Sequence, residues 1–125
     1  DMNPELKKKL AEDTNGLITY EYIANNINDI TDEMSDLVEN MIKVHRSGHF
    51  VVSTARYLNA IDKEKYAAPI DTLIKAAIVK DRERAYLGIL ASSIWGPDYA
   101  NRAEQLSASD DNFRRIYKRL YPVGL

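Results

Sequence analysis

Two histidines, His45 and His49, are the first residues of this sequence whose type and spacing could do chemistry. Imidazoles four residues apart on one helix face can hold a metal ion together. Gly48 lies between them, however, and is expected to end a helix at that point. No carboxylate nearby has a spacing that would complete a ligand set. We therefore expect two surface or boundary histidines, with no metal and no bound cofactor.

Catalytic motifs are not found in the rest of the chain. It contains no cysteine, which removes thiol catalysis and thiolate metal sites and fits a cytoplasmic protein. There is no glycine-rich phosphate loop, no G-x-S-x-G elbow and no H-E-x-x-H sequence. The acids Asp71, Asp81 and Asp98 fall at expected helix starts, where they support or cap a helix. We expect a non-catalytic protein, and an enzyme whose groups converge only in space is the residual alternative.

The C-terminal segment 99–120 carries the most distinctive pattern. Ala103, Leu106, Ser107, Phe113 and Ile116 supply small and apolar residues at a characteristic spacing. This spacing resembles the helix-turn-helix segment of many DNA-binding domains. The resemblance covers about 22 residues, and Ser107 stands where the turn usually has glycine. It implies a second helix that enters the major groove of DNA.

That second helix has a basic stripe opposite its apolar face. Ser109 is expected to cap it, and the stripe consists of Arg114, Arg115, Lys118 and Arg119. In the DNA interpretation these five residues contact the nucleic acid, and affinity falls steeply with salt. Two aspartates at the helix start oppose phosphate, and the helix dipole alone favours cations near a helix C-terminus. We therefore prefer an ordinary amphipathic helix docked on the domain, with the DNA-binding helix as the alternative.

An apolar ladder indicates how these residues are positioned. Its members follow one another at steps of three and four: Tyr20, Ile23, Ile27, Ile30, Met34, Leu37, Met41 and Val44. This spacing predicts one long amphipathic helix at about 19–46. Asp29 or Thr31 could begin a second helix, so a break near 29–31 is the alternative. The stripe is wide and has few flanking charges, which favours a globular bundle over a coiled-coil dimer.

The remaining helices are expected to be shorter. They fall at about 4–13, 50–60, 69–80, 81–94, 98–106 and 109–121, with a strong stop at Trp95-Gly96-Pro97. The fold class we predict is all-α: a single-domain irregular bundle of six to seven helices around the 19–46 helix. The domain spans 1–125, with the helix and loop at 1–16 loosely attached.

A weak internal similarity supports a different arrangement. Shifted by 36 residues, Leu37 meets Leu73 and Ile42 meets Ile78. Each half then reads as helix, tight break, helix, which predicts a solenoid-like repeat of helical hairpins. Any two amphipathic helices aligned in phase also match at apolar positions, so the repeat is the alternative to the irregular bundle.

Charge divides the chain unevenly. Residues 1–40 carry ten acids and three lysines, whereas residues 41–125 carry nine acids and fourteen Lys or Arg. We expect solvated faces of opposite sign, and the alternative is a basic surface in the second half that meets an anion. No apolar run approaches the roughly 20 residues of a membrane-spanning helix, and the charged N-terminus is not a signal peptide. These features predict a cytoplasmic protein that does not bind membranes.

Binding of another macromolecule is the function we expect. The first hypothesis is a protein–protein interaction module that uses a groove between helical hairpins. Its candidate aromatic anchors are Tyr57, Tyr66, Tyr86, Trp95 and Tyr99, although for each residue we prefer a core or boundary role. The alternative is a DNA-binding regulator that uses segment 99–120. The expected partner is a protein, with DNA as the alternative, and association of identical copies stays open.

Overall fold

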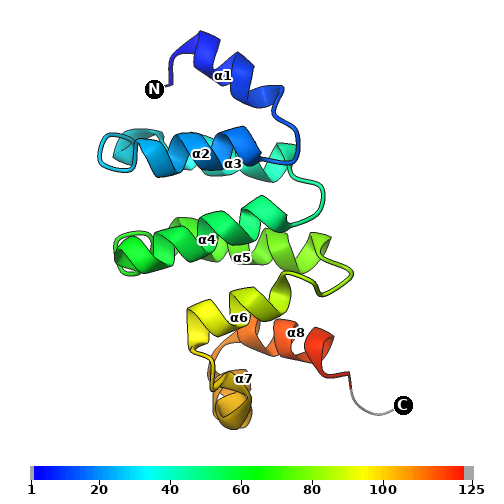
Figure 1. Cartoon of the computed structure of the whole chain (residues 1–125). Coiled ribbons are helices and arrows are strands. Elements are labelled where there is room, and N and C mark those ends of the chain that lie inside the picture. Colours follow the sequence, from blue (N-terminus) through cyan, green and yellow to red (C-terminus); the bar gives the residue numbers. More distant parts are fainter. Residues whose placement is uncertain (1, 123–125) are drawn as a thin grey trace.

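The computed structural model describes residues 2–122, and every regular element in that range is helical (Figure 1). The α-helices are α1 (Pro4–Ala11), α2 (Leu17–Asn25), α3 (Met34–Val44), α4 (His49–Asp62), α5 (Ala67–Lys80), α6 (Leu87–Trp95), α7 (Ala103–Ser109) and α8 (Asp111–Leu120). Short 3₁₀ turns, η1 (Thr31–Glu33) and η2 (Tyr99–Arg102), precede α3 and α7. The predicted all-helical bundle is confirmed, with eight α-helices in these residues rather than six or seven.

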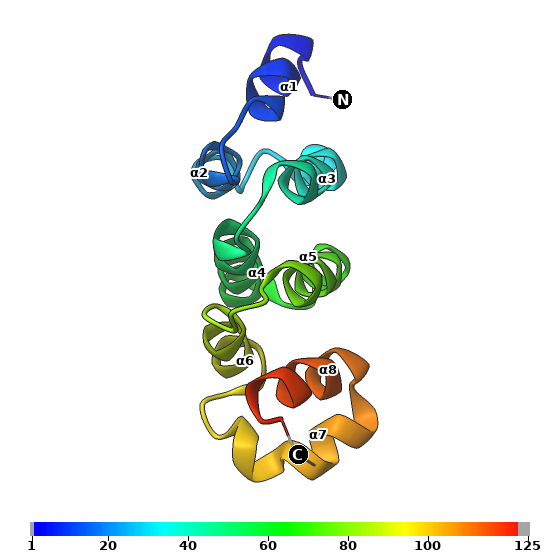
Figure 2. The same cartoon turned by 90° about the vertical axis from the view of Figure 1, so that its right-hand side faces the viewer.

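The helices stack in layers. The pairs α2–α3, α4–α5 and α6–α8 form three successive layers, with α1 at one end of the stack and α7 at the other (Figures 1 and 2). Seen end-on, α2, α4 and α6 form a first column, and α3, α5 and α8 form a second column (Figure 2). The 36-residue shift carries α3 onto the end of α5 and α4 onto the α6 region. The hairpin repeat thus stays an alternative description of the helical bundle, in which α3 packs on α5 and α4 packs on α6.

The continuous helix predicted at 19–46 is wrong, because the chain reverses between α2 and α3. The Asn26 amide donates to the Tyr22 carbonyl at 2.8 Å and so satisfies the end of α2. Asparagine and aspartate compete with helix hydrogen bonds in this way, and Asn28 and Asp29 extend the turn. The apolar ladder stays in phase because α2 and α3 both face one core, with Ile30 buried at the reversal.

The first helix is held against the first layer. The Asn3 carboxamide accepts the Glu5 backbone N–H at 2.8 Å and caps α1. Leu10 is buried, and its carbonyl accepts a hydrogen bond from the Asn40 amide of α3 at 2.9 Å. Asn40 also donates to the Thr19 hydroxyl of α2 at 3.0 Å. One buried amide therefore links α1, α2 and α3.

Two of the turns between layers are held by a buried carboxylate. Asp13 accepts the backbone N–H groups of Ile18 and Thr19, at 3.1 and 2.7 Å, and orders the start of α2. Asp81 accepts those of Tyr86 and Leu87, at 2.7 and 3.0 Å, and orders the start of α6. Asp81 therefore supports the start of α6 from a distance, because the helix predicted at 81–94 begins only at Leu87.

A histidine takes the equivalent place in the turn between α3 and α4. His45 lies 36 residues before Asp81 and is only 3% exposed, so it is not the surface or boundary residue we expected. Its Nδ1 has no hydrogen-bond partner. Burial, and secondarily the charge of Lys80, lower the pKa of His45. α3 ends before His45 and α4 begins at His49, so the two histidines do not share a helix.

Candidate functional site: an apolar groove between α3 and α5

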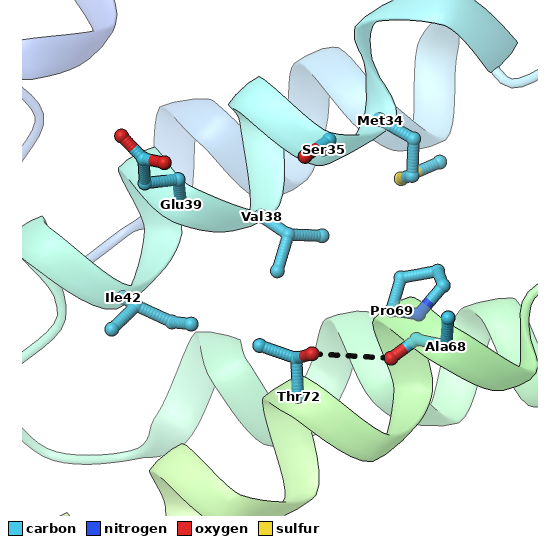
Figure 3. A pocket seen from close by; sticks show the side chains of 8 residues that line it. All are labelled: Met34, Ser35, Val38, Glu39, Ile42, Ala68, Pro69 and Thr72. Atoms are coloured by element: carbon cyan, nitrogen blue, oxygen red, sulfur yellow. Dashed lines mark hydrogen bonds between the residues drawn. The ribbon is translucent and has the colours of Figure 1, made fainter.

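A groove of about 380 Å³ lies in the second column, between α3 and α5 (Figure 3). Its lining comes from two helices that the chain reversal and the layer stacking bring together: Met34, Ser35, Val38, Glu39 and Ile42 from α3, with Ala68, Pro69 and Thr72 from α5. Val38 and Ile42 point into the gap from one side, and Pro69 and Ala68 face them from the other (Figure 3). The groove is therefore an open apolar furrow between two layers.

Short side chains on α5 account for the gap. Protein interiors are normally close-packed, so two helices that leave space must present little bulk to one another. Ala68 and Pro69 are small, and Pro69 is tolerated because it lies in the first turn of α5, where backbone N–H groups have no intrahelical partner. The Thr72 hydroxyl donates back to the Ala68 carbonyl at 3.2 Å (Figure 3). The α5 wall thus offers methyl and ring carbons.

The α3 side of the groove belongs to an acidic layer. Eight acids and no lysine or arginine lie between Lys9 and Lys43: Glu12, Asp13, Glu21, Asp29, Asp32, Glu33, Asp36 and Glu39. Glu39 lines the groove, is exposed, and pairs with Lys43 at 3.5 Å. On α5, Asp71 pairs with Lys75 at 2.7 Å. The groove therefore has an apolar floor and an acidic side on α3.

The first column is bridged where the second is open. The Tyr57 hydroxyl of α4 donates to the Ala24 carbonyl of α2 at 3.3 Å. Arg56 of α4 donates from Nε to the Ser93 hydroxyl of α6 at 2.7 Å. The rings of Tyr20 and Phe50 pack with their centroids 6.0 Å apart. Long side chains thus cross both layer boundaries of this column.

The five predicted aromatic anchors do not gather at the groove. Tyr66 and Tyr99 are buried in the core. Tyr57 bridges α4 to α2, and Tyr86 stacks on His49 with 5.0 Å between ring centroids. Trp95 donates from Nε1 to Asp110 at 3.0 Å and packs edge-on against Phe113. Each therefore contributes to packing, and none lines the α3–α5 groove.

Sequence reasoning missed the groove residues. The available signal was the run Ala67-Ala68-Pro69 followed by Thr72, a stretch of small side chains at the start of an otherwise bulky helix. That signal indicates weak packing only when the facing helix is known. The facing residues lie about one repeat earlier in the chain, on α3.

The basic stripe of segment 99–120 is partly used within the fold. Arg114 forms an ion pair with Asp111, and Arg119 donates from Nη1 to the Asp81 carbonyl at 2.8 Å. Arg115 is half-buried and Lys118 is exposed. Arg119 therefore holds α8 to the turn before α6 instead of projecting freely from the helix.

The predicted cap of α8 is also displaced by one residue. Asp110, not Ser109, caps the helix, because its Oδ1 accepts the Phe113 backbone N–H at 3.1 Å. The Ser109 hydroxyl instead donates to the Gln105 carbonyl at 3.1 Å, at the end of α7. Asp110 is thus the single residue that joins α7 to α8.

Shifted pKa values mark ion pairs and packed phenols. Hydrogen bonding from Lys75 lowers the pKa of Asp71, and hydrogen bonding from Arg114 lowers that of Asp111. The hydrogen bond with Tyr121, together with burial, raises the pKa of Tyr99 to about 12. These shifts are those of structural contacts, not of an acid–base pair. Among residues 2–122, no group of three or more His, Asp or Glu side chains is placed to hold a metal ion.

Comparison with known proteins finds no similar protein. The chain matches no protein-family model, no curated protein and no solved structure. Within the described part of the chain, the helices are too short or too polar for any of them to span a bilayer.

Proposed function

We propose that this protein is a protein–protein interaction module that binds the apolar face of a partner segment in the α3–α5 groove. The observation that carries the proposal is the lining itself. Of its eight residues only Glu39 is charged, and the floor consists of Met34, Val38, Ile42 and Pro69. A groove between two helices is a common receptor for an amphipathic helix, which lays its apolar face between them.

A peptide fits this groove better than a small metabolite does. Small-molecule sites usually combine an apolar cavity with several convergent polar groups that orient the ligand. Here the Thr72 hydroxyl already donates to Ala68, and Glu39 is exposed and paired with Lys43. The groove therefore offers apolar area with few orienting groups.

Charge indicates the kind of partner segment. Because the chain carries eight acids and no base between Lys9 and Lys43, basic residues beside the apolar face of the partner would meet a complementary surface. Such complementarity raises the association rate and makes it depend on salt. We propose a helical segment that is apolar on one face and rich in lysine or arginine beside it.

The DNA-binding alternative has less support than the groove. It needs Arg114, Arg115, Lys118 and Arg119 available for DNA, but Arg119 holds the turn before α6 and Arg114 is paired with Asp111. A recognition helix also needs an exposed N-terminal turn for base edges. At this end of α8, Asn112 and Phe113 are buried.

The test uses a designed amphipathic helix of leucine and lysine, about five turns long, as the probe. Its binding would be measured by fluorescence anisotropy with wild type, with Ile42→Glu in the groove, and with Ile89→Glu as the matched control. Ile89 is 46% exposed on α6 and lies outside the groove lining. We expect Ile42→Glu to weaken binding at least about tenfold and Ile89→Glu to leave it nearly unchanged, as for loss of a central apolar contact.

A leucine–glutamate helix of the same length tests the charge argument. It should bind more weakly than the lysine version, and the difference should shrink as salt rises. Equal binding of the lysine helix to both protein variants would contradict the groove as the binding site. Circular dichroism would confirm that both variants remain helical.

A further inference from the structure

A second pocket, of about 310 Å³, lies where the turn between α3 and α4 meets the turn between α5 and α6. Both turns lie on the same side of the stack, at the right in Figure 1. Gly48 brings them together: it has a φ of +90°, and a Cβ added to it would lie 3.4 Å from the Asp81 Cβ. This pocket shares no lining residue with the α3–α5 groove.

Three cations line the pocket, namely Arg46, Lys80 and Arg82. All three are exposed, and within residues 2–122 none of their side chains has an ion-pair or hydrogen-bond partner. Asp81 does not neutralise them by direct pairing, because its carboxylate is buried and accepts the backbone N–H groups of Tyr86 and Leu87. Glu83 is the remaining acid of the lining. The pocket therefore gathers more positive than available negative charge.

Ser47 adds a directed hydrogen-bond donor to this pocket. Its Oγ accepts the Asn15 amide at 2.9 Å and the His49 backbone N–H at 3.2 Å. A hydroxyl oxygen has two lone pairs and one proton. Since both lone pairs are used, the proton is left to donate, and Ser47 lines the pocket. The turn thus presents an O–H beside three cationic side chains.

The turn that carries Arg82 is held in place by further arginines. Arg119 donates from Nη1 to the Asp81 carbonyl at 2.8 Å, and Arg84 donates from Nη1 to the Arg119 carbonyl at 3.2 Å. Arg84 has a φ of 68°, a left-handed conformation that is uncommon for residues other than glycine. These contacts hold the turn against the C-terminal end of α8.

From this arrangement we propose that the pocket binds a phosphate group. Arginine, lysine and a hydroxyl donor are the groups that hold phosphate oxygens in proteins, through charge-assisted hydrogen bonds. The phosphate could be free or could belong to a phosphodiester backbone, since both present the same anionic oxygens. The proposal does not depend on the function proposed for the groove.

Two probes separate these sources. Inorganic phosphate would be titrated by calorimetry, and a fluorescein-labelled oligothymidylate by anisotropy, at about 50 mM salt where phosphate contacts are strong. The charge variant is Arg46→Gln/Arg82→Gln, and its matched control is Lys7→Gln/Lys8→Gln, which removes two exposed charges from α1. Ser47→Ala is the third variant, because it removes the donor and leaves net charge unchanged.

We expect the Arg46→Gln/Arg82→Gln variant to lose at least about tenfold in affinity and the α1 control to change little, as for loss of phosphate contacts. Ser47→Ala should also weaken binding, which charge alone would not produce. Binding of phosphate without the oligonucleotide assigns a free phosphate, and oligonucleotide binding displaced by phosphate assigns a backbone phosphate. The proposal is overturned if neither probe binds wild type, or if the α1 control loses as much affinity as the pocket variant.

Discussion

Each of the two columns of this molecule stacks three helices, yet the side chains between successive helices differ from one column to the other. In the first column, Tyr57 and Arg56 of α4 hydrogen-bond across to α2 and α6 and bridge both boundaries, beside a smaller pocket of about 260 Å³. In the second, α5 faces α3 with Ala68, Pro69 and Thr72, and a groove of about 380 Å³ remains. Helix stacking alone therefore does not create a binding surface. Side-chain length at each boundary decides whether neighbouring helices are bridged by hydrogen bonds or separated by an apolar groove.

The largest expected effect on stability comes from truncating an apolar side chain in each column. Leu58→Ala on α4 removes a fully buried side chain and should cost about 2–5 kcal/mol of unfolding free energy. Ile42→Ala on α3 removes a half-buried side chain at the open groove and should cost roughly 1 kcal/mol, since less area returns to water. Urea denaturation followed by circular dichroism measures both. Equal losses would contradict an open second column.

A smaller effect on stability, one that depends on pH, should come from His45 in the turn between α3 and α4. The pKa of His45 is lowered by burial, so below about pH 6.5 the unfolded chain takes up a proton that the folded chain resists. Stability should therefore fall as pH drops through 6.5, and this contribution should level off below the folded pKa. His45→Asn should flatten the dependence between pH 7 and 5.5. An unchanged profile for His45→Asn would show that another group titrates there.

The smallest effect concerns a single hydroxyl on each column. Tyr57→Phe removes the hydrogen bond to the Ala24 carbonyl and should cost about 0.5–1 kcal/mol. Thr72→Val removes a bond made within α5 itself, so the loss should be smaller than for Tyr57→Phe. Chemical denaturation of the two variants side by side tests the order. A larger loss of unfolding free energy for Thr72→Val than for Tyr57→Phe would contradict this order.

The sequence predicted much of the local structure because its signals act over a few residues. Trp95-Gly96-Pro97 predicted the end of α6, whereas the start predicted at Asp81 lies six residues before the observed start at Leu87. The break near 29–31 was only the alternative to one long helix, because apolar spacing reports the face of a helix and not the direction of the chain. The cap of α8 was misplaced because Ser109 and Asp110 are adjacent and both are good capping residues.

The candidate sites were harder to predict because each joins residues about one repeat apart. The groove exists because Ala68 and Pro69 are too small to fill the space opposite Val38 and Ile42. A local sequence pattern does not predict such an unfilled space. Tyr66 and Tyr99 illustrate the converse, since aromatic type suggested an anchor where the fold needed a core residue. Burial, which separates the two roles, follows only from the packing of layers.

The two proposed sites are carried by the same pair of helices. α3 lines the groove and leads directly into Arg46, while α5 forms the opposite wall and ends at Lys80. The geometry of both sites therefore depends on the distance between α3 and α5. A segment that wedged α3 and α5 apart would also change the separation of the two cations. If a segment bound in the groove changes the affinity of the pocket for an anion, thermodynamic reciprocity requires that the anion change the affinity of the groove for the segment by the same factor.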